Sequence, residues 1–282
     1  MDRRQREAPR PRLAPAAAGG DPAGRFGYTR GAGGTPTGTT LMAPLSPLVR
    51  GGLLLAVTPL VPLLAAVPGG GWLLPLVAPL TVYGWFRRRV IAGDYLGAWR
   101  LGLLWAALLS LGVIALVMVL PEAAARGILH GEAYRTEMFG WIETGLGREN
   151  DPAAFVPQHL LHLGLFLVLT WVSGGYLGLG LGASLVGYMS YFVGSYAVAS
   201  GHPLAGALAA WVPWSVLRVA AFVLIGAVFA RPLLVRRAWP FERREGMLLA
   251  LAATGILGDI VIKALLASTY GLFLRQLAGG SL

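Results

Sequence analysis

Three ionisable side chains lie deep inside otherwise apolar segments of the chain. Asp259 and Lys263 stand four residues apart in one segment, and Arg218 stands in the segment before it. At 1.5 Å per helical residue, Arg218 and Asp259 lie about 18–20 Å from the ends of their segments, near the centre of a bilayer. A charge at that depth costs at least about 2.5 kcal/mol and faces protein or water instead of lipid. The sequence therefore predicts a buried charge cluster.

Asp259 can neutralise only one of the two cations in this cluster. We expect Asp259 to contact Arg218 or Lys263, because an isolated buried carboxylate would take up a proton. We also expect a bound anion or a polar group beside the remaining cation. Two interpretations stay open: a structural ion pair between two helices, with the spare cation reaching an interface, or part of a substrate or proton pathway.

A polar stripe follows one face of the preceding apolar segment. Ser184, Tyr188, Tyr191 and Ser195 are spaced four, three and four residues apart, which is the spacing of one helical face. Facing the other helices, they would line a water-containing cavity or bond to Arg218. Ordinary hydrogen bonding between helices explains the same pattern.

The histidines give a weaker signal for metal binding. His159 and His162 are three residues apart, so their rings share a helical face. Together with His202 or a loop carboxylate they could form a three-ligand metal site. Histidines at helix ends near a membrane surface are the simpler interpretation.

The sequence contains no motif for other chemistry. It has no cysteine, which excludes thiolate nucleophiles and Cys-ligated metals. It also lacks a phosphate-binding Walker loop, a Gly-x-Ser-x-Gly elbow and a dinucleotide fingerprint. We therefore predict no cofactor and no enzymatic activity.

Long apolar stretches set the fold class. The chain has 56% hydrophobic and only 13% charged residues, whereas soluble domains carry about 25% charged residues. Since a single soluble core could not bury all these stretches, we take lipid as their solvent. The sequence predicts an all-α polytopic bundle of about seven transmembrane helices. The apolar stretches are 51–68, 71–86, 97–120, 158–180, 183–200, 205–230 and 247–273.

The loops alternate in charge, and this alternation predicts the topology. Arg-rich loops follow the second and sixth stretches, whereas the long loop 121–157 is acidic. Lys and Arg collect on the cytoplasmic side of membrane proteins. We therefore predict a multi-pass protein of a bacterial cytoplasmic (inner) membrane, with the N-terminus inside and the C-terminus outside. The net charge of +10 then reflects topology and lipid headgroups, so no nucleic acid is expected.

Two segments near the N-terminus carry predictions of their own. Residues 1–44, rich in Arg, Pro and Gly, are expected to form a disordered cytoplasmic tail ahead of a membrane domain at 45–282, and translation starts at either Met1 or Met42. Prolines interrupt 51–86, which is either two thin spans or a re-entrant hairpin.

The acidic loop contains one helical pattern. Tyr134, Met138, Trp141 and Ile142 recur at the spacing of one apolar helix face. We expect a short amphipathic helix on the outer leaflet, with Trp141 at the level of the headgroups.

Residues of about 158–274 resemble the stage II sporulation protein M family of membrane proteins. The resemblance is carried by GYMSYFVGSYAV, a short turn, and then WVPWSVLRVAAFVLIGAVFA. Pro213 stands where the family has a proline, with Trp214 and Ser215 in place of its His-Gly and Arg218 near its Glu. The resemblance implies a role in membrane scaffolding linked to envelope remodelling and assigns no functional residue.

These features favour a permease-type subunit or transporter for a small solute. The alternative is a non-catalytic structural or assembly subunit of a membrane complex, or an envelope-remodelling scaffold. The expected partners are the lipid bilayer and either partner subunits or further copies of the chain.

Overall fold

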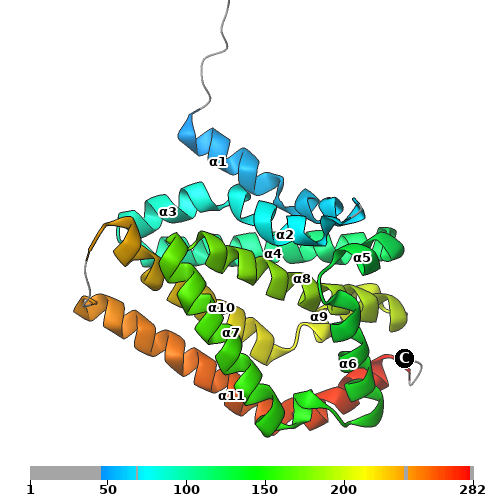
Figure 1. Ribbon diagram of the computed structural model, residues 1–282. Helices are drawn as coiled ribbons and strands as arrows, with labels where there is room; N and C mark the ends of the chain where they lie inside the picture. Colours follow the sequence, from blue (N-terminus) through cyan, green and yellow to red (C-terminus); the bar gives the residue numbers. More distant parts are fainter. Residues whose placement is uncertain (1–45, 68, 238–240, 280–282) are drawn as a thin grey trace, which may run out of the picture. The chain divides into compact units, whose positions relative to one another are not determined.

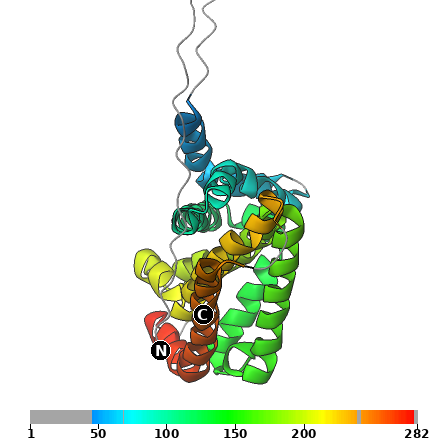
Figure 2. The ribbon, with the colours of Figure 1, turned by 90° about the vertical axis from the view of Figure 1, so that its left-hand side faces the viewer.

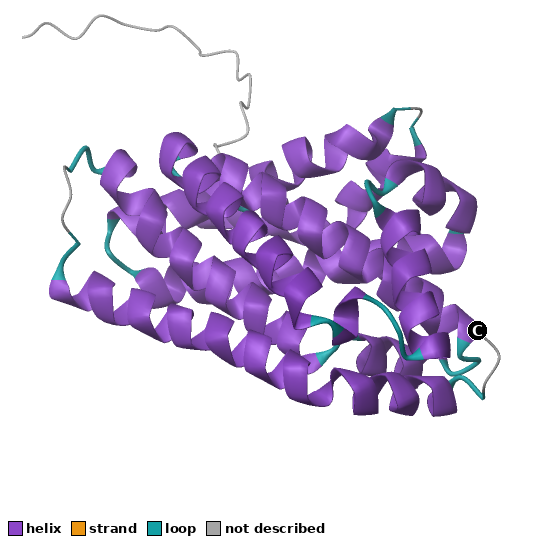
Figure 3. Cartoon of the chain, turned by 60° about the horizontal axis from the view of Figure 1, so that its bottom comes forward, coloured by secondary structure: helices purple, strands orange, loops and turns teal. Residues whose placement is uncertain are grey.

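The fold is built entirely from helices in the part of the chain that the structure describes. The structure is a computed structural model that describes residues 46–67, 69–237 and 241–279, and the predicted tail 1–44 lies outside these residues. Figures 1 and 3 show helices joined by short loops, with no strand in the described ranges. The all-α prediction is confirmed.

Within the described residues, five helices are long enough and apolar enough to cross a membrane. They are compatible with an integral membrane protein, and they correspond to five of the seven stretches expected to span. They are α4 (Tyr95–Val119), α7 (Pro152–Ser173), α8 (Tyr176–Ala199), α10 (Pro213–Leu234) and α11 (Arg243–Leu277).

In the part of the chain that the structure describes, ten shorter helical elements connect or precede these five. They are α1 (Pro47–Ala56), η1 (Thr58–Ala66), η2 (Gly70–Trp72), α2 (Leu73–Val77), η3 (Ala78–Thr81), α3 (Tyr83–Ile91), α5 (Pro121–Gly127), α6 (Gly131–Thr144), η4 (Arg148–Asn150) and α9 (Pro203–Ala210). The elements labelled η are 3₁₀ helices.

Prolines explain why 51–86 forms a hairpin of short pieces instead of two regular helices. Each proline removes a backbone N–H and clashes with the preceding helical turn. Pro62 lies inside η1, and Pro79 is the second residue of the 3₁₀ helix η3. The tip of this hairpin packs tightly against α5, since a Cβ on Gly127 would lie 2.0 Å from the carbonyl oxygen of Ala65.

The predicted stretch 205–230 is two helices and not one. α9 ends before Trp211, and Val212 is extended, with φ −60° and ψ 138°. A residue that precedes a proline avoids the helical region, and Pro213 then starts α10. The break separates a short segment from the long helix that carries Arg218.

The expected amphipathic helix is present as α6, but its apolar face is covered by protein. Met138, Trp141 and Ile142 are at most 2% exposed, and α6 packs on α8 and α11. The ring centres of Trp141 and Trp214 lie 6.4 Å apart. The indole N–H of Trp141 donates a hydrogen bond to the side-chain oxygen of Asn150. Trp141 therefore packs inside protein, and its place at the level of the headgroups stays a prediction.

Four of the long helices form a closed ring. α4 packs on α8, α8 on α7, α7 on α10 and α10 on α4, and none of the extensive contacts joins the diagonal pairs α4–α7 or α8–α10. α11 packs along the outside of α10. Figure 2 shows α4 nearly along its axis. The helices α3 and α10 end on the same side of the bundle, which we call the basic end. The helix α4 ends on the opposite side, which we call the loop end.

Candidate functional site

A narrow cavity occupies the centre of the four-helix ring. Its volume is about 60 Å³, which is room for a few water molecules. Its wall is mostly apolar, with Phe86 of α3 among the side chains near the basic end. Three polar side chains of α7 and α10 also face it: His162, Thr170 and Arg218. The cavity therefore combines apolar walls with a few hydrogen-bonding groups.

Arg218 and Asp259 form the predicted contact between α10 and α11. The Nε of Arg218 donates to one carboxylate oxygen of Asp259 at 2.8 Å, and Nη2 donates to the other at 2.9 Å. Asp259 is fully buried. Such two-point pairing is the strongest geometry for an Arg–carboxylate bond. The third nitrogen of Arg218, Nη1, has no hydrogen-bond partner within the described ranges.

The second buried cation, Lys263, pairs with a residue of the acidic loop. Its ammonium donates to Glu149 at 2.8 Å and lies 4.4 Å from the ring centre of Phe155. Lys263 is 2% and Glu149 is 7% exposed. The loop therefore folds into the bundle through η4 and supplies the counter-charge. The sequence predicted a polar group here but did not identify Glu149.

Two tyrosines lie near the cluster and interact with the charges of Arg218 and Glu149. The rings of Tyr134 (α6) and Tyr188 (α8) have centres 4.8 Å apart, and their planes are tilted by 54°. Burial, with a smaller effect of the Glu149 charge, raises the pKa of Tyr134 well above its usual range. Tyr134 is therefore neutral and adds no charge to the cluster.

His159 joins the cluster without completing a hydrogen bond. Its Nδ1 lies 3.5 Å from a carboxylate oxygen of Asp259, yet this nitrogen is buried and has no hydrogen-bond partner among the described residues. Unpaired buried nitrogens are rare in folded proteins. His159 thus places an unpaired imidazole nitrogen beside the Arg218–Asp259 pair.

The histidines do not assemble the predicted metal site. His202 is the exposed N-terminal cap of α9, whereas His159 and His162 lie on α7. Within residues 46–67, 69–237 and 241–279, no three His, Asp or Glu side chains gather closely enough to hold a metal ion. The two α7 histidines face the charge cluster and the cavity instead.

The polar stripe on α8 is divided among several roles. Tyr188 lines the cavity. Tyr191 donates to Glu132 of α6, while Ser184 and Ser195 donate to backbone carbonyls of α8 itself. None of them bonds to Arg218. The expectation that one whole face lines a cavity is met only at Tyr188.

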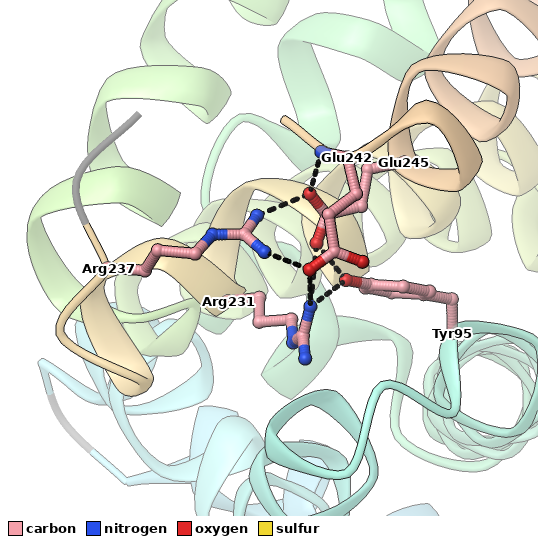
Figure 4. A network of polar contacts seen from close by, with 5 residues as sticks. All are labelled: Tyr95, Arg231, Arg237, Glu242 and Glu245. Carbon is pink, nitrogen blue, oxygen red and sulfur yellow. Dashed lines mark hydrogen bonds and ion pairs between the residues drawn. The ribbon is translucent and has the colours of Figure 1, made fainter. Parts of the chain in front are cut away.

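A second buried network, shown in Figure 4, closes the basic end. The carboxylate of Glu245 on α11 accepts hydrogen bonds from Tyr95 of α4, from Arg231 of α10 at 2.9 Å, and from Arg237 at 2.5 Å. It also accepts from the backbone N–H of Glu242 at 2.9 Å. Glu245 is fully buried, so this network ties three long helices together at one end. The sequence analysis missed it.

Comparison of the chain with protein-family models, with curated proteins and with solved structures finds no match. The resemblance of residues 158–274 to the stage II sporulation protein M family therefore stays a prediction.

Proposed function

We propose that the chain is a seven-span membrane protein in which the proline-broken hairpin supplies two thin crossings. α1 and η1 together rise about 33 Å, and the return through α3 is of similar length, close to the roughly 30 Å of a hydrocarbon core. The tip approaches the loop end, where a Cβ on Gly71 would lie 3.1 Å from Leu129. At the basic end, a Cβ on Gly93 would lie 3.7 Å from Arg231. These contacts favour full crossings over a shallow hairpin.

The charges at the two ends support the orientation that we propose. Arg87–Arg89 and Arg231–Arg237 belong to the basic end, whereas Glu122–Asp151 holds six carboxylates at the loop end. Because cationic loops stay in the cytoplasm, the basic end faces inward. The N-terminus is then cytoplasmic, the C-terminus is outside, and the membrane is a bacterial cytoplasmic membrane.

Within this frame we propose a transporter or permease-type subunit for a small solute. The observation that carries the proposal is the cavity at the centre of the ring, with Arg218 and His162 in its wall. Ionisable groups inside membrane helices usually face a bundle interior or a water-filled path and mark ion or substrate routes. Arg218 also belongs to the buried cluster, so the cavity and the charges form one site.

Water in the cavity can be tested by thiol labelling at two glycines. Because the chain contains no cysteine, a cysteine introduced at either glycine is the only thiol. Gly182 lines the cavity, and Gly164 on α7 is exposed on the apolar surface. A Cβ at either position meets no atom within 4 Å, so both cysteine variants should fold. A charged methanethiosulfonate reagent should label Gly182→Cys in liposomes and leave Gly164→Cys unmodified, because the charged reagent cannot reach a thiol surrounded by lipid.

The labelling result separates the proposed transporter from the alternative function. If neither cysteine reacts, the cavity is dry and the chain is better described as a structural or assembly subunit. A reaction at Gly164→Cys equal to that at Gly182→Cys would mean that α7 does not face lipid. Either result would overturn the proposed pathway.

A further inference from the structure

We propose that the cavity binds a small anion and that the anion enters together with one proton, which the His159–Asp259 pair holds. This inference rests on the proposed transport function, because it names the class of the solute. It follows from the charge balance of the cluster, from the free nitrogen of Arg218 and from the unpaired nitrogen of His159.

The cluster is electrically neutral when its histidines are neutral. Arg218 and Lys263 carry two positive charges, and Asp259 and Glu149 carry two negative charges, each within hydrogen-bond distance of its partner. An anion added alone would leave one uncompensated negative charge in a poorly solvated site, which is costly. One proton arriving with the anion restores neutrality.

Arg218 provides the contact for the anion. Its Nε and Nη2 hold Asp259, whereas Nη1 is free of hydrogen bonds within the described ranges, and the side chain lines the cavity. Guanidinium N–H groups bind carboxylates and other oxyanions well. The mostly apolar wall and the volume of about 60 Å³ fit an anion of the size of a short carboxylate.

His159 and Asp259 provide the place for the proton. Among the described residues, the Nδ1 of His159 lies 3.5 Å from a carboxylate oxygen of Asp259 and has no hydrogen-bond partner. An added proton would make His159 an imidazolium, whose Nδ1–H would face this carboxylate. Other ionisable groups also face the pair. They are Arg218 from α10, Lys263 from α11, His162 from α7, Glu149 from η4, Tyr134 from α6 and Tyr188 from α8.

Thermodynamic linkage turns this arrangement into a measurable effect. If each anion brings one proton, the anion affinity rises as the proton concentration rises, about tenfold for each unit of pH. The dependence reflects the pair as a unit, since two groups this close share their protons. A site that takes the anion alone would show no such slope.

The test measures binding of sodium formate to the purified full-length protein by calorimetry at pH 5.5, 6.5 and 7.5. We expect the wild-type affinity to increase about tenfold per unit of falling pH. Asp259→Asn removes one negative charge and keeps the side-chain shape, so formate should bind it with little dependence on pH. His202→Gln, a histidine outside the cluster, should keep the wild-type slope and serves as the control.

A second measurement on the wild type covers the case in which Asp259→Asn does not fold. In unbuffered solution at pH 6.5, added formate should draw about one proton per bound anion from the medium. Formate binding without proton uptake, or with equal affinity at all three pH values, would overturn the inference while the labelling of Gly182→Cys still supported a pathway. Absence of formate binding beside a labelled Gly182→Cys would overturn the anion as solute class.

Discussion

Asp259→Ala is expected to destabilise the protein more than the double change of Asp259→Ala with Arg218→Ala. The single change leaves the guanidinium of Arg218 at the centre of the bundle without its carboxylate, and breaking a buried ion pair in this way typically costs about 3–5 kcal/mol. The double change removes both charges and leaves only a cavity and lost contacts. Equilibrium unfolding in mixed detergent micelles would give the free energies.

The complete cycle needs Arg218→Ala as well. This variant leaves the carboxylate of Asp259 buried beside His159, and His159 can share a proton with that carboxylate. We therefore expect Arg218→Ala to lower the free energy of unfolding less than Asp259→Ala does. Equal losses for Asp259→Ala and for the double variant would show that Arg218 finds another partner or reaches water. The buried pair would then not stabilise the bundle.

The second large effect is expected at the pair that holds the acidic loop. Glu149→Ala leaves Lys263 inside the protein without its counter-charge. Breaking a buried ion pair in this way typically lowers the free energy of unfolding by about 3–5 kcal/mol. Because Glu149 belongs to η4, the loop should also be cut faster by an added protease. The same unfolding measurement and a proteolysis time course would record both changes.

A surface pair on the same loop gives the matched control. Glu137 and Arg148 lie 3.9 Å apart, and Arg148 is 60% exposed. An exposed pair of this kind contributes about 0–1 kcal/mol to stability. Glu137→Ala should therefore change the free energy of unfolding and the rate of proteolysis little. If Glu149→Ala were as mild as Glu137→Ala, the loop would not depend on Lys263 for its place in the bundle.

The sequence predicted that Asp259 contacts Arg218 or Lys263, because depth along a helix can be counted, and the structure shows the contact with Arg218. Two opposite charges at the same depth on consecutive helices have few other partners, and the cost of isolation favours their pairing. The pairing of Lys263 could not be predicted in the same way. Glu149 is one of six carboxylates in a long loop, and no sequence periodicity says which of them folds inward.

The face of a helix can be calculated from the sequence, but its neighbours cannot. Ser184 to Ser195 do share a face of α8, yet α6 covers Tyr191 and only Tyr188 meets the cavity. The break between α9 and α10 had a local signal in Pro213, which the hydropathy of 205–230 obscured. The Glu245 network joins Tyr95 of α4 to the stretch from Arg231 to Glu245. No sequence pattern shows that α4 meets this stretch.

The proposed pathway is tested most directly by the side of the membrane from which Gly182→Cys can be reached. A transporter exposes its solute site to each side of the membrane in turn. In this structure the hydrogen-bond network around Glu245 and the side chain of Phe86 both lie at the basic end. We predict that a charged, impermeant thiol reagent labels Gly182→Cys both in right-side-out and in inside-out vesicles, at different rates. Labelling from one side only, or from neither, would contradict a solute pathway through the ring.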